Sequence, residues 1–283
     1  MRAFENREYS LSFKESGATY EIVNESYGTV FARQGGHYSL GPRSGDLPPN
    51  QSILSEIRHP GERELTELVK AFEGIRLYRE FSTGPASSLR NGVNASSLGD
   101  HLREDGGNLA LVLNEFNVHR GLERMRKYLL DFYELLEEVL VVTRGGITQV
   151  YVRENGIPEP LAATSLSDGT LRFLCLLAVL LDPNPPPLIC LEEPETGLHP
   201  DAIRTIAELL IEASERTQLV VTTHSPALVD AFTAQPESVL VCERDFDGFT
   251  TIQRLQRQNL DAWLEEYSLG DLWQKGEIGG NRW

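Results

Sequence analysis

Short apolar runs bounded by turn-forming residues dominate the second half of the chain. Four apolar residues at 188–191 follow three prolines, and a second, mostly apolar run occupies 219–222. Runs of this length are typical of strands that are buried on both faces of a parallel sheet. The segment at 171–179 carries apolar residues at helical spacing. This half of the chain therefore predicts an α/β fold with a mainly parallel sheet flanked by helices.

The first part of the chain has a different pattern. Polar and apolar residues alternate at 9–13, 19–23 and 29–33, with glycines between the runs. Such alternation predicts an antiparallel meander that is exposed on one face. Residues 41–50 are rich in turn formers and predict a connector, whereas an apolar stripe at 51–80 predicts helix.

The middle and the end of the chain predict further elements. Residues 82–100 are rich in Ser, Gly and Asn and predict a loop, and 104–136 predict a long helical region. The segment 139–155 predicts a hairpin that turns at two adjacent glycines. Residues 238–245 and 248–255 predict a last pair of strands joined by an FDG turn.

Composition and charge narrow the class of protein. The chain has 283 residues and is 40% hydrophobic, which is enough to build a substantial core. No apolar run approaches 18 residues, and the amino terminus has no signal-peptide pattern, so we expect a cytoplasmic protein without membrane contact. Cys175, Cys190 and Cys242 lie in apolar segments without paired spacing, which predicts reduced core thiols and argues against zinc. A net charge of −16 argues against a broadly basic nucleic-acid-binding surface and leaves a local one open.

Two adjacent carboxylates, Glu192 and Glu193, end the first apolar run. Acidic residues at the carboxyl end of a parallel strand lie where open α/β sheets bind their ligands. Because successive side chains on a strand point to opposite sides, one carboxylate can face a metal while the other faces a different part of the site. Such a pair suits nucleotide hydrolysis, with Glu192 holding Mg²⁺ and Glu193 orienting the attacking water. The alternative is a strand that ends in two solvated acids.

Two flanking segments supply candidate phosphate contacts. Ser167, Asp168 and Gly169 open an apolar helix, and a helix amino terminus presents free N–H groups and a positive dipole end to an anion. An ordinary N-cap is the alternative. His224 follows the second apolar run, where it is a candidate contact for a γ-phosphate. The alternative there is an ordinary core or surface histidine.

The order of the three motifs is more specific than any one of them. The chain carries LSDGTLR, then LICLEEPETGLHP, then TTHSP. This order resembles the second half of an ABC-type ATPase of the SMC/RecF/OLD-like group of AAA family ATPases, which are P-loop NTPases. The resemblance implies that Ser167 and Gly169 belong to the signature motif, which contacts the γ-phosphate of ATP bound by the opposing subunit.

The same resemblance assigns the other motif residues. Glu192 matches the Walker B metal position, Glu193 the catalytic glutamate and His224 the switch histidine of the H-loop. Thr196 to His199 lie where the D-loop of the family crosses the dimer interface. Gln51 is a candidate for the Q-loop glutamine that senses Mg²⁺ and the γ-phosphate, and a polar residue at a helix start is the alternative.

One part that the resemblance requires is not found in the sequence. These ATPases cradle phosphates in a loop of the form G-x-x-x-x-G-K-[ST], and none of the four lysines stands in such a loop. The nearest match, Gly36 to Ser44, has Pro42 at the lysine position, which removes both the ammonium group and a backbone donor. The sequence therefore predicts an ATPase without its amino-terminal Walker A lobe. A truncation, a shortened gene and a misplaced start codon are all open explanations.

On this resemblance the chain divides into four expected parts: 1–50, a remnant of the first lobe; 51–140, a helical insert; 141–258, the carboxy-terminal ATPase lobe; and 259–283, a tail that docks on the body or on a partner. The implied cofactors are ATP and Mg²⁺, and the implied assembly is a homodimer with ATP sandwiched between subunits. DNA and a separately encoded nuclease are candidate partners, in DNA repair or phage defence. The alternative function is a truncated module that cannot hydrolyse ATP and that binds or regulates a partner such as a nuclease.

Overall fold

The computed structural model describes most of the chain and separates it into two compact units. The first unit is Met1–Gly74 and the second is Ile75–Trp283. The described ranges are 8–16, 19–27, 31–40, 43–56, 63–97, 99–118, 121–244 and 248–280. The four parts predicted from the sequence differ from these two units, and their boundaries stay predictions.

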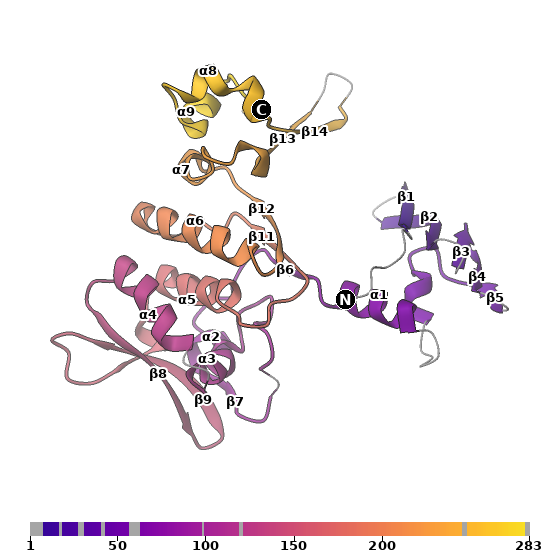
Figure 1. Ribbon diagram of the computed structural model, residues 1–283. Coiled ribbons are helices and arrows are strands. Elements are labelled where there is room, and N and C mark those ends of the chain that lie inside the picture. The colour runs from indigo at the N-terminus through magenta and orange to yellow at the C-terminus, as the bar shows by residue number, and fades with distance from the viewer. Residues whose placement is uncertain are drawn as a thin grey trace. The chain divides into compact units, whose positions relative to one another are not determined.

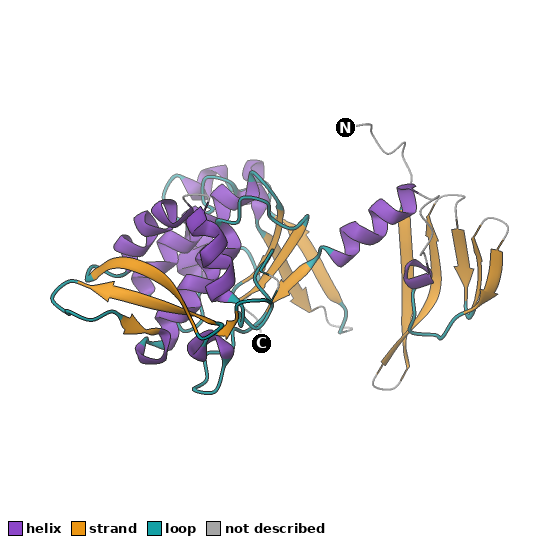
Figure 2. Cartoon of the chain, turned by 90° about the horizontal axis from the view of Figure 1, so that it is seen from below, coloured by secondary structure: helices purple, strands orange, loops and turns teal. Residues whose placement is uncertain are grey.

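The first unit is an antiparallel sheet with helical segments after it. Its elements are β1 (Tyr9–Ser16), β2 (Thr19–Tyr27), β3 (Phe31–Gln34), β4 (His37–Leu40), β5 (Arg43–Asp46), a 3₁₀ turn η1 (Ile53–Glu56) and α1 (Arg63–Glu73). Each strand pairs with its neighbour in chain order, as Figure 2 shows. The predicted meander is therefore confirmed for its described residues.

Two predictions for the first unit are wrong. The segment 41–50 does not act only as a connector, because Arg43–Asp46 pairs with His37–Leu40 and extends the sheet. Hairpin pairing satisfies the backbone groups of this turn-rich segment better than an open connector would. The helix predicted over 51–80 is shorter than expected, since α1 ends at Glu73 and Gly74 follows it.

The second unit is built around a small parallel sheet. Strand β11 (Leu188–Glu192) lies between β12 (Gln218–Thr222) and β6 (Arg76–Tyr78), and both pairings are parallel. This confirms the two strands predicted from apolar runs, and it adds β6, which the sequence pattern had placed in a helix. Burial on both faces is wrong for β12, an edge strand of the described sheet, because Gln218, Val220 and Thr222 are exposed. Because the strands run in parallel, the residues that follow β11 and β12 emerge at one edge of the sheet.

Helices lie beside this small sheet, and a second, longer sheet lies beyond them (Figure 1). The helical elements are α2 (Ser88–Asn91), α3 (Leu109–Val118), α4 (Gly121–Phe132), η2 (Ala163–Ser165), α5 (Asp168–Leu180), α6 (Pro200–Ser214), α7 (Pro226–Asp230), η3 (Pro236–Ser238), η4 (Arg257–Asn259), α8 (Asp261–Leu264) and α9 (Leu269–Gln274). The remaining strands are β7 (Val93–Asn94), β8 (Leu136–Arg144), β9 (Ile147–Glu154), β10 (Leu161–Ala162), β13 (Leu240–Arg244) and β14 (Thr250–Arg254).

Several of these elements match the sequence prediction. Strands β8 and β9 form the predicted hairpin, with Gly145 and Gly146 in its turn at positive φ. Strands β13 and β14 form the predicted last pair, although most of the predicted FDG turn lies outside the described residues. The segment 82–100 is not a plain loop, because it contains α2 and β7.

Helix α5 is the centre of the main core. Its apolar residues were expected on one stripe, but every residue from Phe173 to Leu180 is buried. A helix that is apolar on all sides is buried on all sides. Helix α5 contacts α3 and α6, and α6 in turn contacts β12. The amino terminus of α5 is therefore mounted on the most rigidly packed part of the second unit.

The end of the chain packs against the body of the second unit. Leu269 and Leu272 are fully buried in a small cluster with Val229 of α7. The amide of Gly270 donates to Asp230 Oδ1 at 2.6 Å, and a Cβ at Gly270 would lie 2.4 Å from the Pro226 carbonyl oxygen. The described tail residues therefore dock on the body through Leu269 and Leu272, while Trp263 is exposed and docking of the tail on a partner stays a prediction.

Two further expectations concern thiols and membranes. Cys175 is buried and Cys190 half-buried, whereas Cys242 is exposed on β13, so the prediction of a core thiol is wrong for Cys242. Its strand pairs only with β14 in the described sheet, and Val241 packs on the cluster of Leu269 and Leu272, so the neighbouring Cys242 lies on the opposite, exposed face. Within the described ranges, no helix combines the length and the apolar character needed to cross a bilayer.

Candidate functional site

The carboxyl edge of the parallel sheet brings three of the predicted residues to one place. Glu192 is the last residue of β11 and pairs in register with Thr222 of β12. The amide of Glu193 donates to the Thr222 carbonyl at 2.9 Å, which continues the pairing by one step and leaves His224 just beyond the end of β12. Parallel pairing of two apolar strands therefore positions the motif residues of both.

Glu193 leaves the strand in an unusual backbone conformation. Its φ is +44°, and it is the only residue other than glycine that has a positive φ among the described residues. A bulky residue adopts this region at a cost, and such residues are concentrated at functional sites. The carbonyl of Glu193 accepts from the Thr196 amide at 3.0 Å, so the backbone turns immediately after the carboxylate.

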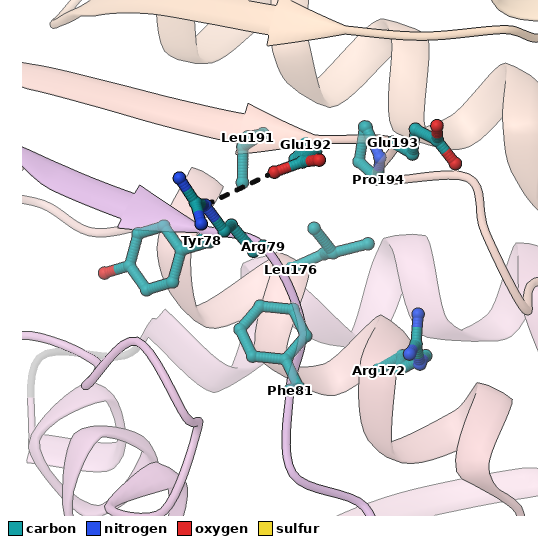
Figure 3. A pocket seen from close by; sticks show the side chains of 9 residues that line it. All are labelled: Tyr78, Arg79, Phe81, Arg172, Leu176, Leu191, Glu192, Glu193 and Pro194. Atoms are coloured by element: carbon teal, nitrogen blue, oxygen red, sulfur yellow. Dashed lines mark ion pairs between the residues drawn. The ribbon is translucent and has the colours of Figure 1, made fainter. Parts of the chain in front are cut away.

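The two glutamates face different partners. Glu193 Oε1 lies 3.8 Å from His224 Nε2, and its Oε2 accepts from Thr196 Oγ1 at 3.1 Å. Glu192 Oε2 lies 3.4 Å from Arg79 Nε, as Figure 3 shows. Both glutamates and the histidine are substantially exposed. These carboxylates and the imidazole are therefore open to a ligand.

The pocket beside the glutamates also contains residues that the sequence motifs did not indicate. Figure 3 shows Arg79 directed toward Glu192, with Arg172 below Glu193. The nine lining residues are Tyr78, Arg79, Phe81, Arg172, Leu176, Leu191, Glu192, Glu193 and Pro194. The pocket thus combines two guanidinium groups with two carboxylates over an apolar floor. Its arginines lie 20 to 114 positions away from the glutamates in sequence, so no local motif could identify them.

The second strand contributes one more contact that sequence reasoning missed. Thr223 Oγ1 donates to Glu195 Oε1 and accepts from the Ser225 amide at 3.0 Å. Ser225 is the N-cap of α7, and its side chain accepts from the Leu228 amide at 3.3 Å. This chain of bonds ties the loop after β11 to the loop after β12. It holds His224 between two fixed neighbours.

The predicted phosphate contacts at 167–169 form the start of α5. Ser167 is the N-cap, and its Oγ accepts from the Thr170 amide at 3.0 Å. Asp168 is the first helical residue, and its Oδ1 lies 2.5 Å from Arg90 Nη2. Hydrogen bonding from Arg90 holds the pKa of the Asp168 carboxyl below its usual range. The carboxylate is therefore ionised and paired at neutral pH.

The same segment touches the residues that follow the glutamates. A Cβ at Gly169 would lie 3.0 Å from the Gly197 carbonyl oxygen, so glycine permits this approach. Arg172 Nη1 donates to the Thr196 carbonyl at 2.9 Å, and its Nη2 lies 3.4 Å from Glu80 Oε1. The start of α5 is therefore locked to the segment 196–197 within one chain.

Gln51 belongs to the first unit and is not part of this group of contacts. Its Nε2 donates to Ser55 Oγ at 2.8 Å. Its carbonyl accepts from Arg33 Nη1, while buried Glu25 accepts from the Ile53 amide at 2.9 Å. The Gln51 segment is thus held by two buried charges of its own unit, and its predicted Q-loop role stays a prediction.

The carboxylates of the site suit a hard cation whose coordination shell is completed by other oxygen ligands. Among the described residues, no group of three or more His, Cys, Asp or Glu side chains could hold a metal ion by itself. Mg²⁺ commonly takes only one or two protein carboxylates and completes its shell with water and substrate phosphates. The exposed Glu192 carboxylate fits that role, provided that it releases Arg79.

Comparisons with known proteins give one family and several similar backbones. The head domain of SMC bound to the C-terminal winged-helix domain of ScpA has a TM-score of 0.46 and 14% identity, covering 86% of this chain and 71% of that one. The SMC head domain from Thermotoga maritima has a TM-score of 0.40 and 13% identity, covering 89% of this chain and 77% of that one. A structure from a study of ATP-driven dimerisation and DNA-stimulated activation of SMC ATPases has a TM-score of 0.40 and 15% identity. This match covers 55% of this chain and 96% of that one. No curated protein matches the chain.

The family match is broader than the motif region from which the resemblance was argued. It runs over residues 23–230 and includes the glutamates, the histidine and the start of α5. The resemblance to AAA family ATPases is confirmed at the level of this family match. Because the match covers more than half of the sequence, the chain belongs to the AAA domain family described as "AAA domain, putative AbiEii toxin, Type IV TA system".

Proposed function

We propose that this chain is the signature and Walker B part of an ABC-type ATPase that binds and hydrolyses ATP between two copies of itself. The observation that carries the proposal is the grouping of Glu192, Glu193 and His224 at the carboxyl edge of the parallel sheet. Catalysis of phosphoryl transfer to water needs a positioned water and neutralised phosphate charge rather than covalent chemistry. The carboxylates and the imidazole at this edge can position a water and, with a bound metal ion, neutralise phosphate charge.

Each residue has a defined task in this proposal. Glu193 accepts a hydrogen bond from the attacking water and orients it, while the Thr196 hydroxyl at 3.1 Å holds one of its oxygens. His224 donates to the γ-phosphate from a position 3.8 Å from Glu193. Glu192 is the residue that would hold Mg²⁺, which when bound neutralises phosphate charge. Glu192 must release Arg79 before it can hold the metal ion.

The amino terminus of α5 acts on the nucleotide of the opposing copy. Ser167 and Gly169 present the Ser167 hydroxyl and free backbone amides at the positive end of a helix dipole. The contact between Gly169 and Gly197 links this end to the segment 196–199, which would cross the dimer interface. Two bound nucleotides would close the dimer and hydrolysis would reopen it. By family resemblance, such a switch would serve DNA repair or phage defence, with DNA or a nuclease as partner.

A second function is supported by the sequence itself. The 283 residues contain no G-x-x-x-x-G-K-[ST] loop, so the proposed ATPase would take its phosphate cradle from outside them or from a segment that this motif does not identify. A chain that never meets such a loop would be a module that cannot hydrolyse ATP and that binds or regulates a partner protein. Calorimetric titration of the chain with Mg-ATP separates these cases. Binding that is lost in Glu193→Ala would show that a cradle forms within the chain, whereas no binding would favour an external loop or the inactive module.

Substitution of Glu193 tests the catalytic assignment. In the assembly that supplies the phosphate loop, we expect Glu193→Gln to retain ATP binding and to lower turnover by about 10²–10⁴-fold, because it removes the group that orients water. Phosphate release and ATP binding are measured together. The matched control is Glu208→Gln, which changes an exposed glutamate on α6 that pairs with Arg204 one turn earlier in the same helix. Wild-type turnover in Glu193→Gln would contradict the assignment.

A further inference from the structure

Arg90 has more hydrogen-bond partners than any other side chain near the site. It lies on α2, in the segment that the sequence predicted as a loop, and only 11% of its side chain is exposed. Its Nε donates to the Thr83 carbonyl at 2.6 Å. The rest of its guanidinium faces the chain that leads into α5. A buried guanidinium is stable only when its donors are satisfied, and here all the described bonds go to acceptors of the protein.

The acceptors on the α5 side all lie within the six residues 163–168. Arg90 Nη1 donates to the carbonyls of Ala163 at 3.0 Å, Thr164 at 3.3 Å and Leu166 at 2.7 Å. Its Nη2 bonds to Asp168 Oδ1 at 2.5 Å. Residues 163–168 form η2 and the N-cap turn, where carbonyls lack regular helical partners. One planar fork thus fixes the whole turn that ends in the Ser167–Gly169 segment, which lysine cannot do with a single nitrogen.

Arg90 itself is held by the second sheet. Its carbonyl accepts from Gln149 Nε2 of β9 at 2.7 Å. A Cβ at the following glycine, Gly92, would lie only 2.7 Å from the Thr148 carbonyl oxygen, and Gly92 has a φ of +85°. The backbone of α2 is therefore pressed against β9. This gives the guanidinium a rigid base.

The pairing also changes the charge at the start of α5. Asp168 is 66% exposed, so an unpaired carboxylate there would repel a phosphate that approaches Ser167 and Gly169. The Arg90 guanidinium compensates this charge and leaves the positive end of the helix dipole available. Fixing the turn and compensating the carboxylate are two effects of one side chain.

We propose that Arg90 is the positioning residue of the Ser167–Gly169 segment: it fixes the turn 163–168 and compensates Asp168, so that the start of α5 can accept a phosphate. The proposal rests on the proposed function for the role of the phosphate, but the fixing of the turn is independent of it. Arg90 does not touch the nucleotide in this scheme. It acts through the segment that does.

Hydrogen exchange without nucleotide tests the fixing of the turn. In Arg90→Lys we expect the amides of Leu166, Thr170 and Leu171 to exchange at least about tenfold faster, because their local acceptors lose support. The matched control is Arg216→Lys, since Arg216 donates to the Leu180 carbonyl at 2.6 Å and so supports the other end of α5. Unchanged exchange at these amides, or the same acceleration in both variants, would overturn the proposal.

A measurement on the unaltered protein keeps the proposal testable if Arg90→Lys does not fold. The pKa of the Asp168 carboxyl, followed by NMR, should lie below the ordinary aspartate range because Arg90 bonds to the ionised form. A pKa at or above that range would mean that the pair does not form in solution and would overturn the proposal.

Association with ATP tests the effect on phosphate binding. In the assembly that supplies the phosphate loop, and in a Glu193→Gln background that should trap the ATP-bound dimer, Arg90→Lys should weaken Mg-ATP-dependent association by at least about tenfold. Adding Asp168→Asn should restore part of it, because the uncompensated carboxylate is gone. Full association in Arg90→Lys would overturn the proposal. Failure of Glu193→Gln itself to associate would instead count against the proposed function, and the exchange experiment would still decide the role of Arg90.

Discussion

Two arginine–carboxylate pairs lie at the candidate site, and they differ in how firmly they are held. Arg79 and Glu192 are 3.4 Å apart and their side chains are 72% and 53% exposed. Arg90 and Asp168 are 2.5 Å apart, with the arginine almost entirely buried. An exposed pair is weak and easily exchanged, whereas a buried guanidinium with several acceptors is costly to displace.

The difference matches the tasks proposed for the two places. Glu192 has to release its arginine before it can hold a metal ion, so a weak pair is suited to it. The start of α5 has to present a fixed set of donors to a phosphate, and fixed donors need no rearrangement when the ligand arrives. The site thus combines two parts: an adaptable edge at the end of β11, with Glu192 and Arg79, and a rigid edge at the start of α5, with Asp168 and Arg90.

The rigid edge depends first on the packing of α5, and this gives the largest expected effect. Phe173 is fully buried and its ring centroid lies 4.3 Å from that of Phe132. Phe173→Ala should lower the free energy of unfolding of the second unit by about 3–5 kcal/mol, because it removes a large side chain from a close-packed core. Unfolding in urea can be followed by tryptophan fluorescence, since all three tryptophans belong to the second unit. Ile252→Ala on exposed β14 is the control and should change little. A loss below about 1 kcal/mol for Phe173→Ala would contradict a rigid α5.

The next effect concerns the surface that α5 presents rather than its packing. Ser167→Arg places a long side chain over the donors of Ser167 and Gly169, so we expect ATP-dependent association of two copies to weaken by at least about 100-fold. In the assembly that supplies the phosphate loop, nucleotide binding before association should be nearly unchanged if the segment acts on the opposing copy. Sedimentation and calorimetry measure the two properties separately. Ser214→Arg, at the exposed end of α6, is the control. Loss of nucleotide binding by the single copy would show that the segment acts within its own chain.

The contrast between the two edges also explains how much the sequence could predict. The strands predicted at 188–191 and 219–222 and the helix start predicted at Ser167 depend on local patterns, and the structure contains all three as β11, β12 and α5. Arg90 contacts residues 73 to 78 positions away, and its own segment has the composition of a loop. No local pattern distinguishes a buried arginine with five acceptors from a surface one. Its role was therefore visible only in the structure.

The wrong predictions about the fold also arose from contacts that are distant in sequence or not visible in local composition. Residues 41–50 and 76–78 were assigned from local composition and from a helical stripe that continues past Gly74, but sheet pairing decided both. Pairing partners for 76–78 lie more than 110 positions away, at β11. The positive φ of Glu193 follows likewise from the turn after β11 and has no signature in the residue type. The assigned roles of the glutamates, His224 and the Ser167–Gly169 segment stay predictions until substitutions test them.

The smallest expected effect belongs to the adaptable edge. Arg79→Ala removes an exposed partner from Glu192, so the free energy of unfolding should change by less than about 0.5 kcal/mol. Urea unfolding of the second unit measures this value, and Glu192→Gln should give the same small change because it breaks the same pair from the other side. A loss above about 1.5 kcal/mol in Arg79→Ala would mean that Arg79 fixes the end of β11 as Arg90 fixes the start of α5. In that case Glu192 could not release its arginine at low cost, and its assignment as the metal-holding carboxylate would have to be abandoned.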